Sequence, residues 1–164
     1  MKKPNIPKGH NTANSFIITK DASKLIEFLQ EVFGATEDPA AHTVDNDGLL
    51  IHSELAIGDS IVMVGDTKPG RPFTPSLLRV YVDDVDGTLK RAKKLGAKIV
   101  TEPTDFYGDV FSRFTDPWNN LWWVFKHNPR PKVKLNGTRM KVMTMHHGSP
   151  AKKCSISMPH YWKP

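Results

Sequence analysis

The sequence predicts an α+β fold in which two βαβββ half-modules pack on each other, with a cleft between curved sheets. Three observations predict it: one pattern occurs twice, each copy opens with a short apolar strand and an aspartate-initiated helix, and each copy closes with several extended segments. The halves are expected over residues 13–66 and 76–127. Self-similarity of this kind is typical of a paired domain, and a cleft lined by two sheets can hold a small molecule.

The first half is expected to open with a strand over residues 13–19. Asp21 is a good helix N-cap, and apolar residues at helical spacing follow it up to Gly34, which can end the helix in a left-handed conformation. The polar segment 37–48 predicts a loop or a short edge strand. Residues 49–64 then predict a hairpin, because two apolar runs flank a turn that contains glycine and aspartate.

The second half follows a linker, residues 66–75, that is rich in proline and glycine. A strand over residues 77–82 leads into a helix that Asp83 or Asp84 is expected to cap. The segment 104–109 is expected to be a loop that presents two aromatic side chains. The remaining strands are expected over residues 98–100, 110–115 and 121–125.

The composition favours one domain in a reducing compartment. Of the 164 residues, 38% are apolar and 24% are charged, which is ordinary for a globular chain. No apolar run approaches the roughly 18 residues of a membrane span, and no apolar stretch follows the basic start to complete a secretory signal. Cys154 is the one cysteine, so no intramolecular disulfide can form. We expect a cytoplasmic protein without a membrane partner.

Positive charge is concentrated in the C-terminal part of the chain. Residues 1–12 are expected to form an irregular lead-in, residues 13–127 the domain, and residues 128–164 a basic tail that can be mobile. The net charge of +6 divides into about −2 before this tail and +8 within it. A solvated tail is the favoured interpretation, and a nucleic-acid partner is not expected because no recognition helix is found. The alternative is an interaction protein whose tail docks on nucleic acid by neutralising phosphates.

Together these features resemble the vicinal oxygen chelate superfamily, the glyoxalase, bleomycin-resistance and extradiol-dioxygenase group. The resemblance covers residues 13–127 and rests on the paired halves and on four motifs, Phe33-Gly34-Ala35, Leu95-Gly96-Ala97, the hairpin 54–60 and the turn Asp116-Pro117. It implies a pseudo-duplicated vicinal oxygen chelate domain and a homodimer whose clefts are built partly across subunits. The superfamily includes isomerases, epimerases, dioxygenases, thiol transferases and proteins that only sequester antibiotics, so function has to be argued from the site.

The resemblance also implies four ligand positions for a divalent metal ion, one on each of four strands. They fall at Asn14, Glu54, Leu77 and Trp123. Glu54 can coordinate a metal, whereas Leu77 and Trp123 cannot, and a catalytic metal typically needs about three protein ligands. We therefore expect no metal and no other cofactor. The alternative is one divalent metal ion bound through Glu54.

His52 lies two residues before Glu54 in a predicted strand, so both side chains share one face. The favoured interpretation is a histidine satisfied by hydrogen bonds beside a carboxylate, with half a metal site or an acid–base pair as alternatives. If burial raises the pKa of Glu54 toward neutrality, this carboxylate becomes a candidate general base.

Without a metal, the cleft is expected to be apolar and aromatic. Flat side chains can sandwich a planar ligand, and Arg79 can neutralise an acidic group or stack on a ring. Trp122 and Trp123 are neighbours in a strand and face opposite ways, and the family register favours Trp123 for the cleft. The predicted ligand-binding residues are Asn14, Phe16, His52, Glu54, Arg79, Tyr81, Phe106, Tyr107 and Trp123.

The sequence thus predicts a metal-independent, small-molecule-binding protein of the glyoxalase and bleomycin-resistance type. Its ligand is expected to be planar or amphipathic, and binding itself would be the function. The alternative is a lyase, isomerase or dioxygenase of the same superfamily that uses Glu54 as a metal ligand or general base. Neither a nucleophile elbow nor a phosphate-cradling glycine loop occurs, which argues against acyl transfer and nucleotide hydrolysis.

Overall fold

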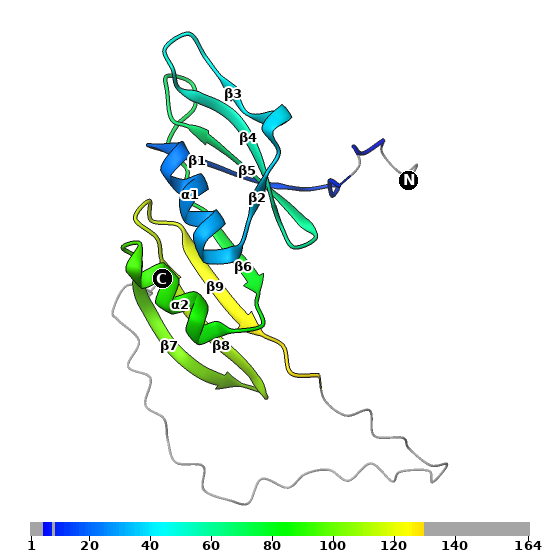
Figure 1. Ribbon diagram of the computed structural model, residues 1–164, viewed down its shortest axis with the longest axis vertical. Helices are drawn as coiled ribbons and strands as arrows, with labels where there is room; N and C mark the ends of the chain where they lie inside the picture. Colours follow the sequence, from blue (N-terminus) through cyan, green and yellow to red (C-terminus); the bar gives the residue numbers. More distant parts are fainter. Residues whose placement is uncertain (1–4, 8, 130–164) are drawn as a thin grey trace, which may run out of the picture. The chain divides into compact units, whose positions relative to one another are not determined.

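Two βαβββ half-modules follow one another along the chain, as predicted (Figure 1). The computed structural model describes residues 5–7 and 9–129, which belong to one unit, Met1–Pro129. The predicted basic tail, from residue 130 onwards, lies outside the described residues. The first half comprises β1 (Ser15–Thr19), α1 (Ala22–Phe33), β2 (Thr36–Glu37), a 3-10 turn (Pro39–Ala41), β3 (Thr43–Val44), β4 (Leu50–Ile57) and β5 (Ser60–Asp66). The second half comprises β6 (Leu77–Tyr81), α2 (Val85–Lys94), β7 (Lys98–Phe106), β8 (Asp109–Thr115) and β9 (Leu121–Lys126).

Each half forms its own sheet, and the two sheets have corresponding strand orders. The order is β1-β5-β4-β2 in the first sheet, where β3 also pairs with β4, and β6-β9-β8-β7 in the second. In each half the first strand pairs in parallel with the last, with Ile17 opposite Val64 and Val80 opposite Val124. The other strand pairs are antiparallel. The duplicated sequence pattern is therefore a duplicated fold.

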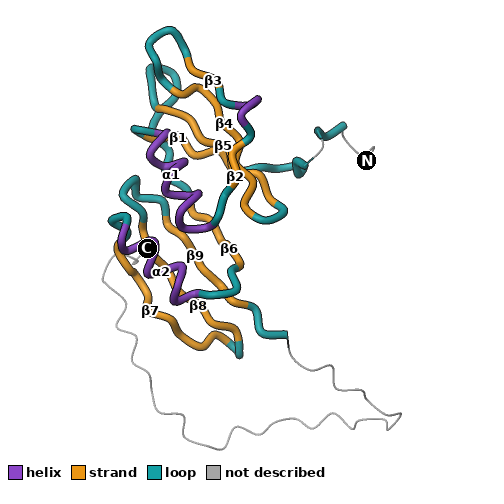
Figure 2. Tube along the Cα trace, viewed as in Figure 1, coloured by secondary structure: helices purple, strands orange, loops and turns teal. Residues whose placement is uncertain are grey.

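A shared apolar core lies between the helices and one face of each sheet. Helix α1 buries Leu25, Leu29 and Val32 at helical spacing, and α2 contributes Leu89 to the same core. Arg91 of α2 links the helices, because its guanidinium donates to the Val32 carbonyl over 3.0 and 3.2 Å. Figure 2 shows each helix beside the strands of its own half. Within the described residues, no helix has the length and apolarity to span a membrane.

The helix ends follow the predictions with one exception. Gly34 has φ 67° and ends α1, and the Asp84 side chain caps α2 by accepting a backbone N–H over 3.0 Å. Asp21 stands at the predicted N-cap position, but its φ is 53° and its side chain makes no cap hydrogen bond. The Ala22 N–H donates instead to Oδ1 of Asp66 over 2.9 Å, so the acceptor at the start of α1 comes from the end of β5.

Strand β7 is much longer than the predicted segment 98–100. It runs past Pro103 into the predicted loop 104–109, of which only Tyr107 and Gly108 form the turn, with φ 56° and 90°. Two register shifts interrupt its pairing with β8, and β7 lies at the sheet edge, where a residue without an N–H is tolerated. The loop prediction was therefore wrong for residues 104–106, which pair with β8.

Candidate functional site

Each sheet has one face packed under the helices and one face turned away from them, which we call the first and the second open face. Residues opposite one another in neighbouring strands, or two apart in one strand, share a face. The first open face carries Phe16, His52, Glu54 and Met63. The second open face carries Arg79, Tyr81, Phe111, Arg113, Trp123 and Phe125.

On the first open face, Glu54 lies between two histidines. Oε1 of Glu54 is 3.1 Å from Nε2 of His52, and Oε2 is 3.2 Å from Nε2 of His10. The ring of His52 in turn meets the Phe16 ring edge-on, with the centroids 5.7 Å apart. The Glu54 carboxylate is thus held between His52, from its own strand, and His10, from the lead-in segment.

The hydrogen bond with His52 is the largest influence on the pKa of Glu54, and it lowers that pKa. Burial raises it, but the hydrogen bond and charge of His10 lower it further, so the pKa lies below its usual value of 4.5. A general base at neutral pH needs a pKa closer to the working pH. The sequence analysis required a raised pKa for Glu54 to act as a general base, and the pKa is lowered instead. The contact between His52 and Glu54 agrees with the favoured interpretation, a hydrogen-bonded histidine beside a carboxylate.

Arg71, which the sequence analysis did not single out, packs against the same sheet. Its Nη2 donates to the Ile51 carbonyl over 2.6 Å, and its guanidinium carbon is 5.6 Å from the centroid of the Phe16 ring. Gly65 makes this approach possible, because a Cβ there would lie 2.7 Å from Nη2 of Arg71. Nη1 is buried and has no hydrogen-bond partner among the described residues. The guanidinium is thus held at the edge of the first open face.

The second open face consists of two rows of side chains that cross β6, β9 and β8. Three aromatic residues form one row, and the other places an indole between two guanidinium groups. From β6 through β9 to β8, the first row is Tyr81, Phe125 and Phe111. The second row, in the same order, is Arg79, Trp123 and Arg113. Phe106 extends the aromatic surface, because its ring centroid is 5.8 Å from that of Phe111 and 6.0 Å from that of Phe125.

Both arginines of this face lie over aromatic rings. The guanidinium carbon of Arg79 is 3.7 Å from the centroid of Phe125, and that of Arg113 is 5.4 Å from Trp123. Nε of Arg113 donates to the hydroxyl of Thr101 over 2.9 Å, which fixes the side chain. Nε1 of Trp123 is buried and has no acceptor among the described residues. This surface therefore combines flat rings with donors and positive charge.

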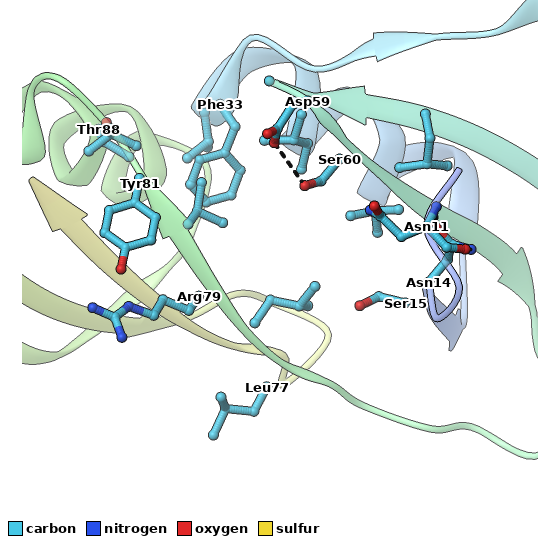
Figure 3. A pocket seen from close by; sticks show the side chains of 18 of the residues that line it. Asn11, Asn14, Ser15, Phe33, Asp59, Ser60, Leu77, Arg79, Tyr81 and Thr88 are labelled. Atoms are coloured by element: carbon cyan, nitrogen blue, oxygen red, sulfur yellow. Dashed lines mark hydrogen bonds between the residues drawn. The ribbon is translucent and has the colours of Figure 1, made fainter. Parts of the chain in front are cut away.

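A groove of about 720 Å³ lies between the two halves (Figure 3). Asn14 and the β4–β5 turn line it from the first half, and the edge strand β6, with Arg79 and Tyr81, lines it from the second. The Asn14 amide is engaged locally: it accepts from the Asn11 N–H over 3.0 Å and donates to the Asn11 carbonyl over 2.8 Å. The sequence predicted a cleft between the halves, and this groove occupies that position.

The nine predicted ligand-binding residues fall in three places. Phe16, His52 and Glu54 lie on the first open face. Asn14 lies in the groove, and Arg79 and Tyr81 lie both in the groove and on the second open face. Trp123 is central to the second open face, Phe106 is at its margin, and Tyr107 contacts Phe106 from the turn. Glu54 and Trp123 belong to different sheets, and their roles as ligand contacts stay predictions.

Several residues of these surfaces were not predicted as site residues from the sequence. Phe111 and Arg113 alternate in a predicted strand, and Phe125 lies two residues after Trp123, so the period of two contained a signal for all three. His10 and Arg71 come from irregular segments, where no periodicity indicates direction. Only the folded chain brings those two to the first open face.

The residues at the four family positions do not fit a divalent metal. Leu77 is apolar and 61% exposed, and the indole of Trp123 offers only an N–H donor. Asn14 is engaged with Asn11, which leaves Glu54 as the one carboxylate of the set. In the part of the chain that the structure describes, no group of three or more His, Cys, Asp or Glu is arranged to hold a metal ion.

Comparison with known proteins supports the duplicated fold. The model of the Glyoxalase/Bleomycin resistance protein/Dioxygenase superfamily matches residues 10–124. TioX from Micromonospora sp. ML1 is 26% identical over 71% of this chain and 99% of its own, with a TM-score of 0.58. No curated protein matches the sequence.

Two further solved structures are similar at lower identity and support the fold alone. A glyoxalase/bleomycin resistance protein/dioxygenase family enzyme from Burkholderia phytofirmans PsJN is 21% identical over 70% of this chain and 98% of its own, with a TM-score of 0.59. The fosfomycin resistance protein FosX from Listeria monocytogenes, complexed with Mn(II) and sulfate, is 20% identical over 72% of this chain and 93% of its own, with a TM-score of 0.52.

Proposed function

Because the chain belongs to the Glyoxalase/Bleomycin resistance protein/Dioxygenase superfamily, we propose that it binds a planar or amphipathic small molecule without a metal. One observation carries the proposal: Trp123, at one of the four metal-ligand positions that the resemblance implies, lies on an aromatic face between Arg79 and Arg113. A position that would hold a metal ligand thus contributes a flat ring, which suits stacking and not coordination.

The second open face supports this proposal by its composition and exposure. Tyr81 is 60% exposed and Phe106 is 49% exposed, next to the rings of Phe111 and Phe125. Phe111 and Phe125 are themselves buried, so Tyr81 and Phe106 supply the exposed aromatic surface, which is suited to a ligand contact. The adjoining groove, with a volume of about 720 Å³, is large enough for a drug-sized molecule.

We further propose a homodimer, by analogy with the family, whose clefts are built partly across subunits. A cytoplasmic location, as expected from the single cysteine, remains part of the proposal.

A second candidate function is a metal-dependent lyase, isomerase or dioxygenase. The cluster of Glu54 with His10 and His52 favours it, because these side chains are potential ligands, and FosX, a protein of similar fold, has been solved with Mn(II). In this chain both histidines already contact oxygens of the one carboxylate. Of the other family positions, Leu77 and Trp123 offer no ligand and Asn14 is hydrogen-bonded to Asn11.

Metal analysis separates the two candidates. Untagged protein, purified without chelator, is incubated with excess Zn(II), Ni(II), Mn(II) or Fe(II), desalted and analysed by mass spectrometry. Retention of less than about one tenth of an equivalent is expected, since a stable site needs about three ligands. Planar compounds should then raise the melting temperature, because a ligand that binds only the native state stabilises it. About one equivalent of metal, lost in Glu54→Gln, would favour the enzyme instead.

A further inference from the structure

We propose that Arg79 and Arg113 form a pair of anion-binding groups, and that the ligand is a planar aromatic molecule with an acidic group. This inference rests on the proposed function and names the ligand class for the second open face. The two arginines lie opposite Trp123 in neighbouring strands, on the same side of the sheet. Two strand spacings separate them, roughly 10 Å.

The pair has no counter-charge among the described residues. No ion pair joins Arg79 or Arg113 to a carboxylate there, whereas Lys68 pairs with Asp45 at 2.7 Å and Lys93 approaches Glu102 at 3.9 Å. Arg113 uses its Nε for Thr101, and its terminal amino groups make no hydrogen bond with described residues. The face therefore presents two guanidinium groups whose outer donors are not used by described protein groups.

The environment of the pair makes an anionic partner favourable. Both cations lie over aromatic rings, with Arg79 3.7 Å from the centroid of Phe125 and Arg113 5.4 Å from the centroid of Phe111. The rings cover one side of each guanidinium, and the other side is left for an anionic partner.

The shape of the face determines the rest of the ligand. Between the arginines lie the indole of Trp123 and, in the next row, the rings of Tyr81 and Phe125. Phe125 is buried under Arg79, whereas Tyr81 and Phe106 are exposed. A flat aromatic body can stack on the exposed rings while a carboxylate, sulfonate or phosphate at its edge accepts from a guanidinium. A neutral aromatic compound satisfies only the first of these two contacts.

Two naphthalene probes of equal size test the inference. Binding of 2-naphthoate and of its neutral analogue 2-naphthamide is measured by calorimetry on the full-length protein and on Arg79→Gln, Arg113→Gln and the double variant. Lys126→Gln is the matched control, because Lys126 is an exposed cation in β9 that alternates onto the helix-facing side. Thermal unfolding of each variant confirms that it folds.

The expected result is at least tenfold tighter binding of 2-naphthoate than of 2-naphthamide, since one charge-assisted hydrogen bond contributes about a factor of ten. The double arginine substitution should weaken 2-naphthoate binding by roughly that factor and leave 2-naphthamide binding unchanged, and the Lys126→Gln variant should bind both probes like the native protein. Equal binding of both probes to all variants would overturn the anion pair and leave the aromatic binding face intact. Failure of both probes to bind would overturn the planar-ligand function as well.

The state of assembly supplies an independent readout. Sedimentation of the double variant without any probe should match that of the native protein. If the double variant loses a subunit contact that the native protein makes, the arginines serve assembly, and the inference is overturned.

Discussion

The Asp66 carboxylate, at the end of β5, accepts the backbone N–H of Ala22, the first residue of α1, over 2.9 Å. Its second oxygen accepts the N–H of Leu50 over 2.8 Å, where β4 begins. One buried side chain thereby satisfies a helix terminus and a strand terminus together. The first half-module, which supplies the first open face, depends on this connection.

Substitution Asp66→Ala should lower the free energy of unfolding by about 2–4 kcal/mol, because two buried N–H groups lose their acceptors. Urea denaturation followed by circular dichroism measures the change. Asp21→Asn is the control, since Asp21 makes no cap hydrogen bond and asparagine tolerates its positive φ. The control should change stability by less than about 0.5 kcal/mol, and equal losses in both variants would contradict the assignment of the cap.

Two tryptophans that are neighbours in β9 should respond differently to the same substitution. Trp122 is fully buried and its Nε1 donates to Oδ2 of Asp116 over 2.8 Å, so Trp122→Phe should cost about 2–3 kcal/mol of stability. Trp123 has no acceptor for its Nε1 among the described residues, so Trp123→Phe should change stability by less than about 0.5 kcal/mol. Thermal or urea unfolding of the two variants compares them, and a larger loss at Trp123 would contradict the orientation of β9.

The Glu54 carboxylate should make the stability of the protein depend on acid pH. Its pKa is lowered in the folded state, first by the hydrogen bond with His52. The ionised carboxylate therefore stabilises the fold at pH values above its pKa in the unfolded chain, about 4.5. That contribution is lost as the pH falls through the folded pKa. Unfolding free energies measured from pH 6 to pH 3 should therefore fall less steeply in Glu54→Gln than in the native protein. Parallel curves would show that the histidines do not hold the carboxylate.

Gly65 is expected to be intolerant of a side chain. A Cβ at this position would lie 2.7 Å from Nη2 of Arg71 and 2.7 Å from the Ile51 carbonyl oxygen. The guanidinium can move but the backbone oxygen cannot, so Gly65→Ala should destabilise the protein by about 1–3 kcal/mol. Urea unfolding of Gly65→Ala, Arg71→Ala and the double variant measures how much of this loss comes from Arg71. Strict additivity of the two losses would contradict the contact between these residues.

The sequence predicted the features of this fold that depend on local periodicity. The strands around Ile17 and Val80 and the helix ended by Gly34 could be identified from residue patterns and turn chemistry, because a period of two or 3.6 determines which face a side chain takes. The same rule separated Trp123 from Trp122, since neighbours in a strand face opposite ways. The duplication itself was visible because each half repeats these local signals in the same order.

Contacts between distant segments were decided only by the tertiary structure. The acceptor for the first N–H of α1 lies 44 residues further along the chain, so no local pattern identified Asp66 in place of Asp21. The segment 104–109 was expected to be a loop, and the extension of the edge strand β7 past Pro103 became visible only in the folded chain. Arg113 came beside Trp123 through the register of β8 against β9, and His10 came to Glu54 from an irregular lead-in. Sequence periodicity specifies the direction of a side chain, whereas its partners depend on how separate strands align, and that alignment is a property of the whole folded chain.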